Sequence, residues 1–75
     1  MADEYIEFVR EWLAGRESKT QEELRKNANA AHRVDCSGSH FLMFARNASK
    51  SALYNCPDAA AHWVKMYEEL TNGQN

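Results

Sequence analysis

Residues 57–73 read PDAAAHWVKMYEELTNG, and this stretch predicts a helix with both of its ends marked. Pro57 suits the first helical position, because the N–H that proline lacks would have no partner there. Asp58 places a negative charge near the positive end of the helix dipole, and Gly73 is a natural left-handed C-cap. At about 100° per residue, one face gathers apolar side chains, namely Ala59, Ala60, Trp63, Met66, Tyr67 and Leu70. We expect this face to pack against a core; the alternative is a groove for a ligand or partner.

The composition of the whole chain favours helices over strands. Only six of the 75 residues are β-branched and none lies between Val34 and Val64, whereas alanine occurs eleven times. Strands favour β-branched and aromatic residues, and helices favour alanine. A chain of this length forms one domain with a small core. We therefore predict an all-α fold, with residues 1–75 forming a single compact bundle of about four short helices.

The first helix is predicted to run from Glu4 to about Ala14, with Asp3 as its cap and Gly15 closing it. Its expected buried stripe consists of Ile6, Val9 and Leu13, with Tyr5 and Trp12 at one edge. Phe8 lies off this stripe, on the side that carries the acidic residues.

A second helix is predicted from Gln21 to about Arg33. Thr20 and Glu23 form the pattern T-x-x-E of a capping box, in which the side chain of each residue accepts a hydrogen bond from the backbone N–H of the other. The apolar stripe of this helix is thin and consists of Leu24, Ala28 and Ala31. Such small residues allow a neighbouring helix to approach closely.

Residues 40–56, HFLMFARNASKSALYNC, are ambiguous. As a helix capped by Ser39, they place apolar residues at helical spacing, namely Phe41, Phe44, Ala45, Ala48 and Ala52. As a β-hairpin, residues 40–45 and 51–56 would be strands, which gives an α+β alternative of helix, helix, hairpin and helix. The absence of β-branched residues favours the helix, because an isolated hairpin is marginally stable.

Charge is distributed unevenly along the chain. Residues 1–23 carry a net charge of −4, residues 24–56 carry +4, and residues 57–75 carry −2. The basic centre either packs against the acidic ends or faces an acidic partner. There is no apolar run long enough to span a membrane and no stretch typical of a signal peptide, so we expect a cytoplasmic protein.

The acidic first helix suggests a partner-binding surface, formed by Glu4, Glu7, Phe8 and Glu11. An aromatic side chain set among acids is a candidate contact, because aromatic residues are enriched at interface hot spots. We predict that these four residues bind a basic surface on a protein partner. Such a helix could also mimic nucleic acid and so inhibit a larger assembly that binds nucleic acid. The alternative for Phe8 is a helix covered on two sides, or a single surface aromatic.

The basic centre suggests nucleic-acid binding as an alternative function. The candidate residues are Arg25, Lys26, Arg33, Arg46 and Lys50. Phe41 and Phe44 lie nearby for stacking on bases, and residues 21–51 align loosely with a helix-turn-helix motif that has Gly38 at its turn. Against this, the whole chain is acidic, and the residues that would lead the recognition helix are apolar.

Histidines and cysteines suggest a second alternative, a zinc-stabilised domain. The candidate ligands are Cys36, His40, Cys56 and His62, with His32 as a fifth. Zinc is bound by four such side chains in small domains, but structural zinc sites usually include a close pair such as C-x2-C, and this chain has none. A disulfide between the two cysteines is a further alternative, and a reducing compartment favours free thiols.

No pattern of an enzyme is present. The chain has no glycine-rich phosphate loop and no paired catalytic carboxylates, and a small domain leaves little room for a deep pocket. Cys56 and His62 lie too far apart on one helix for a catalytic dyad. We predict a non-enzymatic interaction module without a cofactor, acting as an adaptor, regulatory subunit or inhibitor, with a homodimer as a further possibility.

Overall fold

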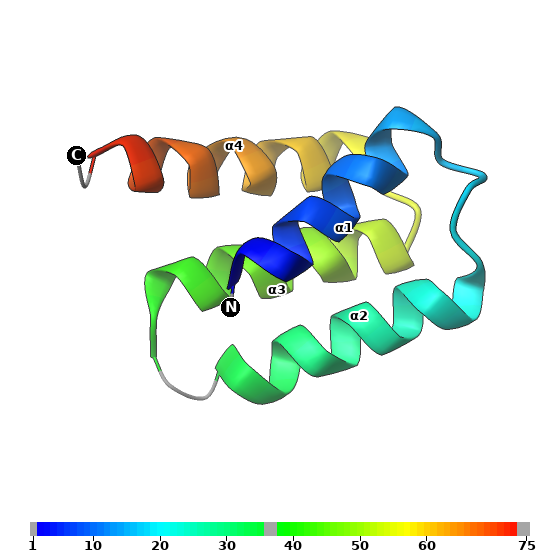
Figure 1. The fold of residues 1–75 in the computed structure, drawn as a ribbon, viewed down its shortest axis with the longest axis horizontal. Coiled ribbons are helices and arrows are strands. Elements are labelled where there is room, and N and C mark those ends of the chain that lie inside the picture. The colour runs from blue at the N-terminus through cyan, green and yellow to red at the C-terminus, as the bar shows by residue number, and fades with distance from the viewer. Residues whose placement is uncertain (1, 36–37, 74–75) are drawn as a thin grey trace.

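The fold consists of α-helices joined by short connections (Figure 1). The computed structural model describes residues 2–35 and 38–73. Within these ranges the helices, in chain order, are α1 (Ala2–Ala14), α2 (Gln21–Val34), α3 (His40–Leu53) and α4 (Pro57–Gly73). No strand occurs in the described ranges, so the all-α prediction is confirmed and the hairpin alternative for residues 40–56 is wrong.

Helix α3 lies at the centre of the bundle. It contacts each of the other three helices, whereas α2 and α4 do not contact each other. Figure 1 shows α4 along one side of α3 and α2 along the other, with α1 crossing over α3. The capping residue Ser39 has extended backbone angles, and the Met43 N–H donates to its carbonyl oxygen at 3.0 Å. The lack of β-branched residues was therefore a reliable guide to this segment.

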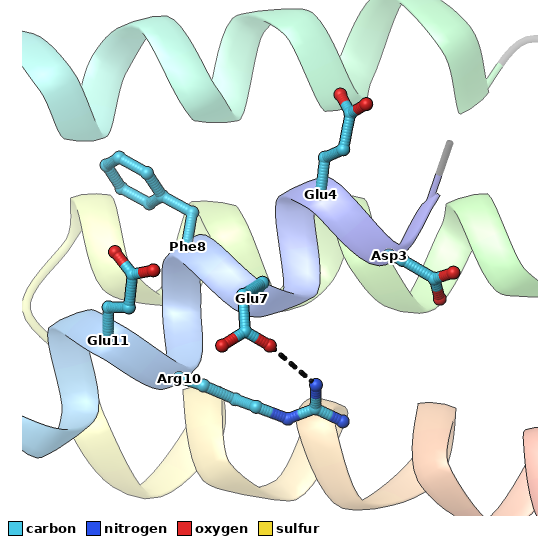
Figure 2. Close-up of a pocket in the computed structure, with 6 residues that line it drawn as sticks. All are labelled: Asp3, Glu4, Glu7, Phe8, Arg10 and Glu11. Atoms are coloured by element: carbon cyan, nitrogen blue, oxygen red, sulfur yellow. Dashed lines mark hydrogen bonds and ion pairs between the residues drawn. The ribbon is translucent and has the colours of Figure 1, made fainter.

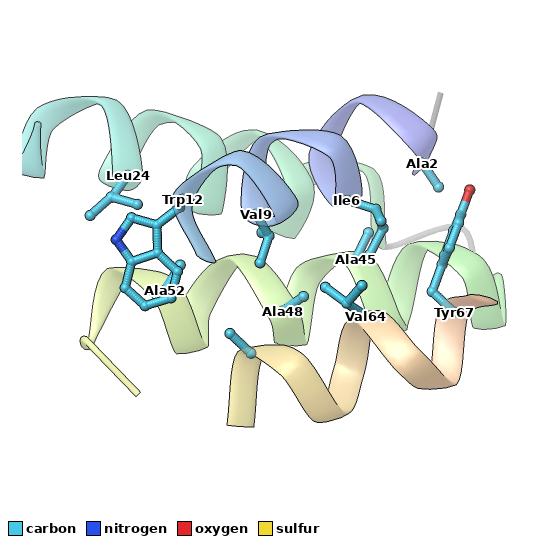
Figure 3. Packing of buried hydrophobic residues seen from close by; sticks show 11 residues of the cluster. Ala2, Ile6, Val9, Trp12, Leu24, Ala45, Ala48, Ala52, Val64 and Tyr67 are labelled. Carbon is cyan, nitrogen blue, oxygen red and sulfur yellow. The ribbon is translucent and has the colours of Figure 1, made fainter. Parts of the chain in front are cut away.

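The core is formed by large side chains of α1 against alanines of α3 (Figure 3). Ile6 and Val9 are fully buried, and Trp12 is 2% exposed. The α3 contribution is a stripe of small residues, Ala45, Ala48 and Ala52. Leu24 of α2 and three residues of α4 complete the cluster, the latter being Ala60, Val64 and Tyr67. The small α3 residues let the surrounding helices approach closely, as the sequence suggested for α2.

In α1 and α4 the buried side of the helix differs from the side that the sequence predicted. In α1, Trp12 is buried and Leu13 is half-buried, which reverses the predicted roles of these residues. Trp12 lies between Leu24 and Ala52 in Figure 3, because α2 and α3 both cover that side of α1. In α4, the buried face centres on Val64, which the predicted stripe omitted. This helix packs against α1 as well as α3, and its most buried face lies between those two neighbours.

The predicted helix ends need two corrections. Helix α1 begins at Ala2, so Asp3 lies in its first turn instead of capping it. Gly73 is included in α4 and its backbone does not adopt the left-handed conformation. Among the described glycines, only Gly38 has a positive φ, of 80°, in the connection before α3. A left-handed turn is needed there because the chain reverses between α2 and α3.

The predicted capping box at the start of α2 is confirmed. The Glu23 N–H donates to Thr20 Oγ1 at 3.1 Å, and the Thr20 N–H donates to Glu23 Oε2 at 2.6 Å. The helix then continues through the predicted stripe of Leu24, Ala28 and Ala31, all of which are buried. The bonds donated by the Thr20 backbone and hydroxyl groups stabilise the ionised carboxylate and hold the pKa of Glu23 below its ordinary value of 4.5.

We expect Glu23→Gln to change the pH dependence of stability. Glutamine keeps the capping geometry but cannot ionise. Because the folded pKa of Glu23 is depressed, its carboxylate stabilises the wild type above about pH 4.5, and this advantage is lost as the pH falls through the folded pKa. Thermal unfolding of both proteins is measured between neutral and strongly acidic pH. The wild type should have the higher melting temperature near neutral pH, and this difference in melting temperature should disappear in acid. Glu69→Gln, at an exposed residue of α4, is the control. A difference in melting temperature that stays constant with pH would contradict the depressed pKa of Glu23.

Candidate functional site

The four predicted partner-binding residues lie together on the outer face of α1. Glu4, Glu7, Phe8 and Glu11 line one open surface hollow with a volume of about 490 Å³, and Asp3 and Arg10 complete its lining (Figure 2). The spacing i, i+3, i+4 and i+7 puts the four on one side of the helix. Ile6 and Val9 occupy the opposite side, inside the core. The grouping predicted from the sequence is therefore present in the folded chain.

Phe8 differs from its prediction as an exposed aromatic. Its side chain is half-buried and packs against the edge of the hydrophobic core. Lys19, in the connection between α1 and α2, places its Nζ atom 4.7 Å from the centre of the Phe8 ring. An ammonium over an aromatic face is attracted by the electrons of the ring. Phe8 therefore supports α1 and offers only part of its ring to a partner.

The hollow remains acidic although several of its carboxylates are paired. Arg10 contacts Glu7 at 3.0 Å and Glu68 of α4 at 2.8 Å, and Lys19 contacts Glu11 at 2.7 Å. Burial of the Arg10 guanidinium opposes its charge, but hydrogen bonds to the two carboxylates outweigh this and raise the pKa of Arg10. The six lining residues include four carboxylates and one guanidinium, which gives a net charge of −3.

Glu4 and Asp3 differ in how available their charges are. Within the described ranges Glu4 makes no ion pair; its side chain is exposed and extends from α1 toward α2 in Figure 2. Asp3 accepts a hydrogen bond from the Tyr67 hydroxyl group, which ties the start of α1 to α4. Surface ion pairs are individually weak, so a partner's cations can compete for Glu7 and Glu11 as well. Glu4 is nevertheless the least restrained negative charge of the hollow.

The predicted nucleic-acid-binding residues lie on two different helices, α2 and α3. Arg46 forms an ion pair with Asp35 at 3.1 Å, and Lys26 lies 3.8 Å from Glu22. Two more of the set, Arg25 and Arg33, are exposed on α2. In the helix-turn-helix alignment the recognition helix corresponds to α3, which packs against all three other helices. The alignment itself stays a prediction.

Two of the predicted zinc ligands, His40 and Cys56, lie at opposite ends of α3. His40 begins α3 and Cys56 follows its end, so about 20 Å of helix separates them. No group of three or more histidine, cysteine or acidic side chains is placed to hold a metal ion in residues 2–35 and 38–73. His40 stacks on Phe44 and His62 contacts the Trp63 ring instead. Cys36 lies outside the described residues, and so does the predicted disulfide; Cys56 is exposed.

Comparison with protein families, with curated proteins and with solved structures finds no match to this chain. The described helices include none that combines the length and apolar character needed to cross a bilayer.

Proposed function

We propose that the protein is a non-catalytic binding module that presents the outer face of α1 to a basic surface on a protein partner. Its place is that of an adaptor, a regulatory subunit or an inhibitor of a larger assembly. The observation that carries the proposal is the meeting of Glu4, Glu7, Phe8 and Glu11 along one open, acidic hollow. Complementary charge speeds association and excludes partners of the wrong sign.

The arrangement of the hollow supports binding in two ways. Its acids stand on a helix that is anchored by four buried residues, so they are held on a rigid element before the partner arrives. The half-buried ring of Phe8 adds an apolar contact between the charges. Interfaces commonly combine an aromatic anchor with a charged rim. The rim here is set by Glu4 on one side of the ring and Glu11 on the other.

The test is a pair of charge reversals that have equal effects on net charge. Glu4→Lys changes an unpaired acid of the hollow, and Glu69→Lys changes an exposed acid of α4. Both side chains are exposed, so both variants should fold. In affinity purification from cells of the source organism, Glu4→Lys should recover at least about tenfold less of the partner, because like charges then face each other. Glu69→Lys should recover it as the wild type does.

Equal recovery of the partner by Glu4→Lys and the wild type would contradict the proposed use of α1. Loss with both variants would show that only net charge matters, and would also count against a defined surface. Phe8→Ala is a poor test by itself, because this ring also packs against the core. Circular dichroism of each variant confirms that the helices are intact before binding is compared.

A further inference from the structure

A second surface lies on α3, on the side away from the core. Two hollows, of about 300 and 230 Å³, flank this side of the helix. Lys50 and Tyr54 line both of them and so form the ridge between the two. Lys50 lies about 160° around the helix from both Ala48 and Ala52, which are buried. The ridge therefore faces outward, between α2 and α4.

The charge of this surface is opposite to that of the α1 hollow. Among the described residues, none of those that line either hollow is acidic. In the part of the chain that the structure describes, neither Lys50 nor Arg25 forms an ion pair. Arg25 lies one turn of α2 from Asn29, which lines the smaller hollow together with His32. It also lies one turn from Gln21, whose amide donates to the Leu53 carbonyl oxygen at 3.3 Å. Arg25 is exposed and shares this face of α2 with Gln21 and Asn29.

Aromatic side chains accompany the cations. Tyr54 is 68% exposed, and it is the large apolar side chain that stands out most from the described surface. Trp63 of α4 is half-buried in the larger hollow and is braced by Phe44, whose ring centre lies 5.8 Å away in a stacked arrangement. His62 contacts the Trp63 ring at 4.9 Å. A braced indole and an exposed phenol thus border the same hollow.

We propose that this surface, centred on Lys50, Tyr54 and Trp63, binds single-stranded nucleic acid. Aromatic rings stack on bases without regard to sequence, while cations contact the phosphates between them. Tyr54 and Trp63 supply the rings, and Lys50 and Arg25 supply the charges. Each hollow is at or below about 300 Å³, the lower limit of ordinary ligand sites, which suits a single nucleotide unit.

The test is fluorescence anisotropy with a labelled oligothymidylate of about twelve nucleotides, a length within the range covered by small single-strand binding sites. The intact chain should bind it at low ionic strength, and the affinity should fall with added salt. Tyr54→Ala should weaken binding about fivefold or more, because one stacked base is lost. Lys50→Glu should weaken it further, whereas Lys65→Glu, an exposed residue of α4 with the same change in charge, should have little effect.

A matched abasic oligomer and an acidic peptide separate the sources of affinity. The abasic oligomer should bind more weakly than the oligothymidylate, and Tyr54→Ala should not weaken it further. Quenching of tryptophan fluorescence on binding should vanish in Trp63→Phe, because Trp12 is buried. Equal binding of the abasic oligomer, stronger binding of the acidic peptide, equal loss with Lys65→Glu, or no binding at low salt would each overturn the proposal.

Discussion

Trp12→Ala is expected to destabilise the protein by about 3–5 kcal/mol, the usual cost of deleting a large buried aromatic side chain. Trp12 is 2% exposed and lies where α1, α2 and α3 meet. Its removal leaves a cavity beside Leu24 and Ala52 that neither short side chain can fill. A domain of 75 residues has a total stability of about 4–11 kcal/mol. Trp12→Ala should therefore lose a large share of the stability of the fold.

Urea denaturation followed by far-ultraviolet circular dichroism measures this loss, because the signal reports helices and does not depend on tryptophan. Tyr54→Ala is the matched control, since it truncates an aromatic ring that is 68% exposed. It should change the free energy of unfolding by less than about 0.5 kcal/mol. A Trp12→Ala protein that unfolds within about 1 kcal/mol of the wild type would show that the core is not built as described.

Ala48→Leu is expected to cost about 1–3 kcal/mol by overpacking. Ala48 is fully buried on the face of α3 that lies inside the bundle, between Ala45 and Ala52. Leucine has a better hydrophobic transfer energy but needs space that the close helix packing does not leave. The substitution tests the close packing of α3 inside the bundle, because an alanine on a solvent-facing side of a helix would accept the larger side chain.

Ala61→Leu is the control for that substitution, because Ala61 is exposed in the middle of α4. Both changes add the same atoms to a helical alanine, so helix propensity cancels in the comparison. Thermal unfolding should show a lower melting temperature for Ala48→Leu and little change for Ala61→Leu. A stabilised Ala48→Leu protein would mean that there is empty space beside Ala48, which would contradict the close packing of α3.

Local signals in the sequence were sufficient to predict the helices. The capping pair Thr20 and Glu23 fixes the start of α2 with contacts made within four residues. Pro57 marks the start of α4 in the same way. Residues 40–53 lack such a clear signal at their start, and their helical state followed from composition. Each of these inferences depends on short-range preferences, which the sequence displays directly.

The buried faces were harder to predict, because they depend on which helices are neighbours. Val64 is buried only because α4 touches both α1 and α3. The exposure of Phe8 was predicted from the helical spacing of α1 alone. That spacing cannot show that Lys19, in the next connection, lies over the Phe8 ring. The acidic grouping on α1 was predictable because its spacing lies within one helix.

The surface at Lys50 and Tyr54 was only partly visible in the sequence. Arg25 and Lys50 were identified as cations, but Tyr54 and Trp63 were not recognised as their aromatic neighbours. These residues come from three helices, and the contacts that join them depend on the packing of α2 and α4 on either side of α3. Arg46 could not be excluded in advance, since its ion pair with Asp35 forms only when α2 and α3 are folded together.

The measurement that tests the proposed function most directly is a map of the binding surface by nuclear magnetic resonance. The ¹⁵N-labelled chain is titrated with the partner recovered by the wild type, and amide shifts are followed residue by residue. We expect the largest shifts in residues 3–11 of α1, where the acidic hollow lies. Largest shifts around Lys50, Tyr54 and Trp63 with none in α1 would contradict the proposal that the acidic face of α1 binds the protein partner.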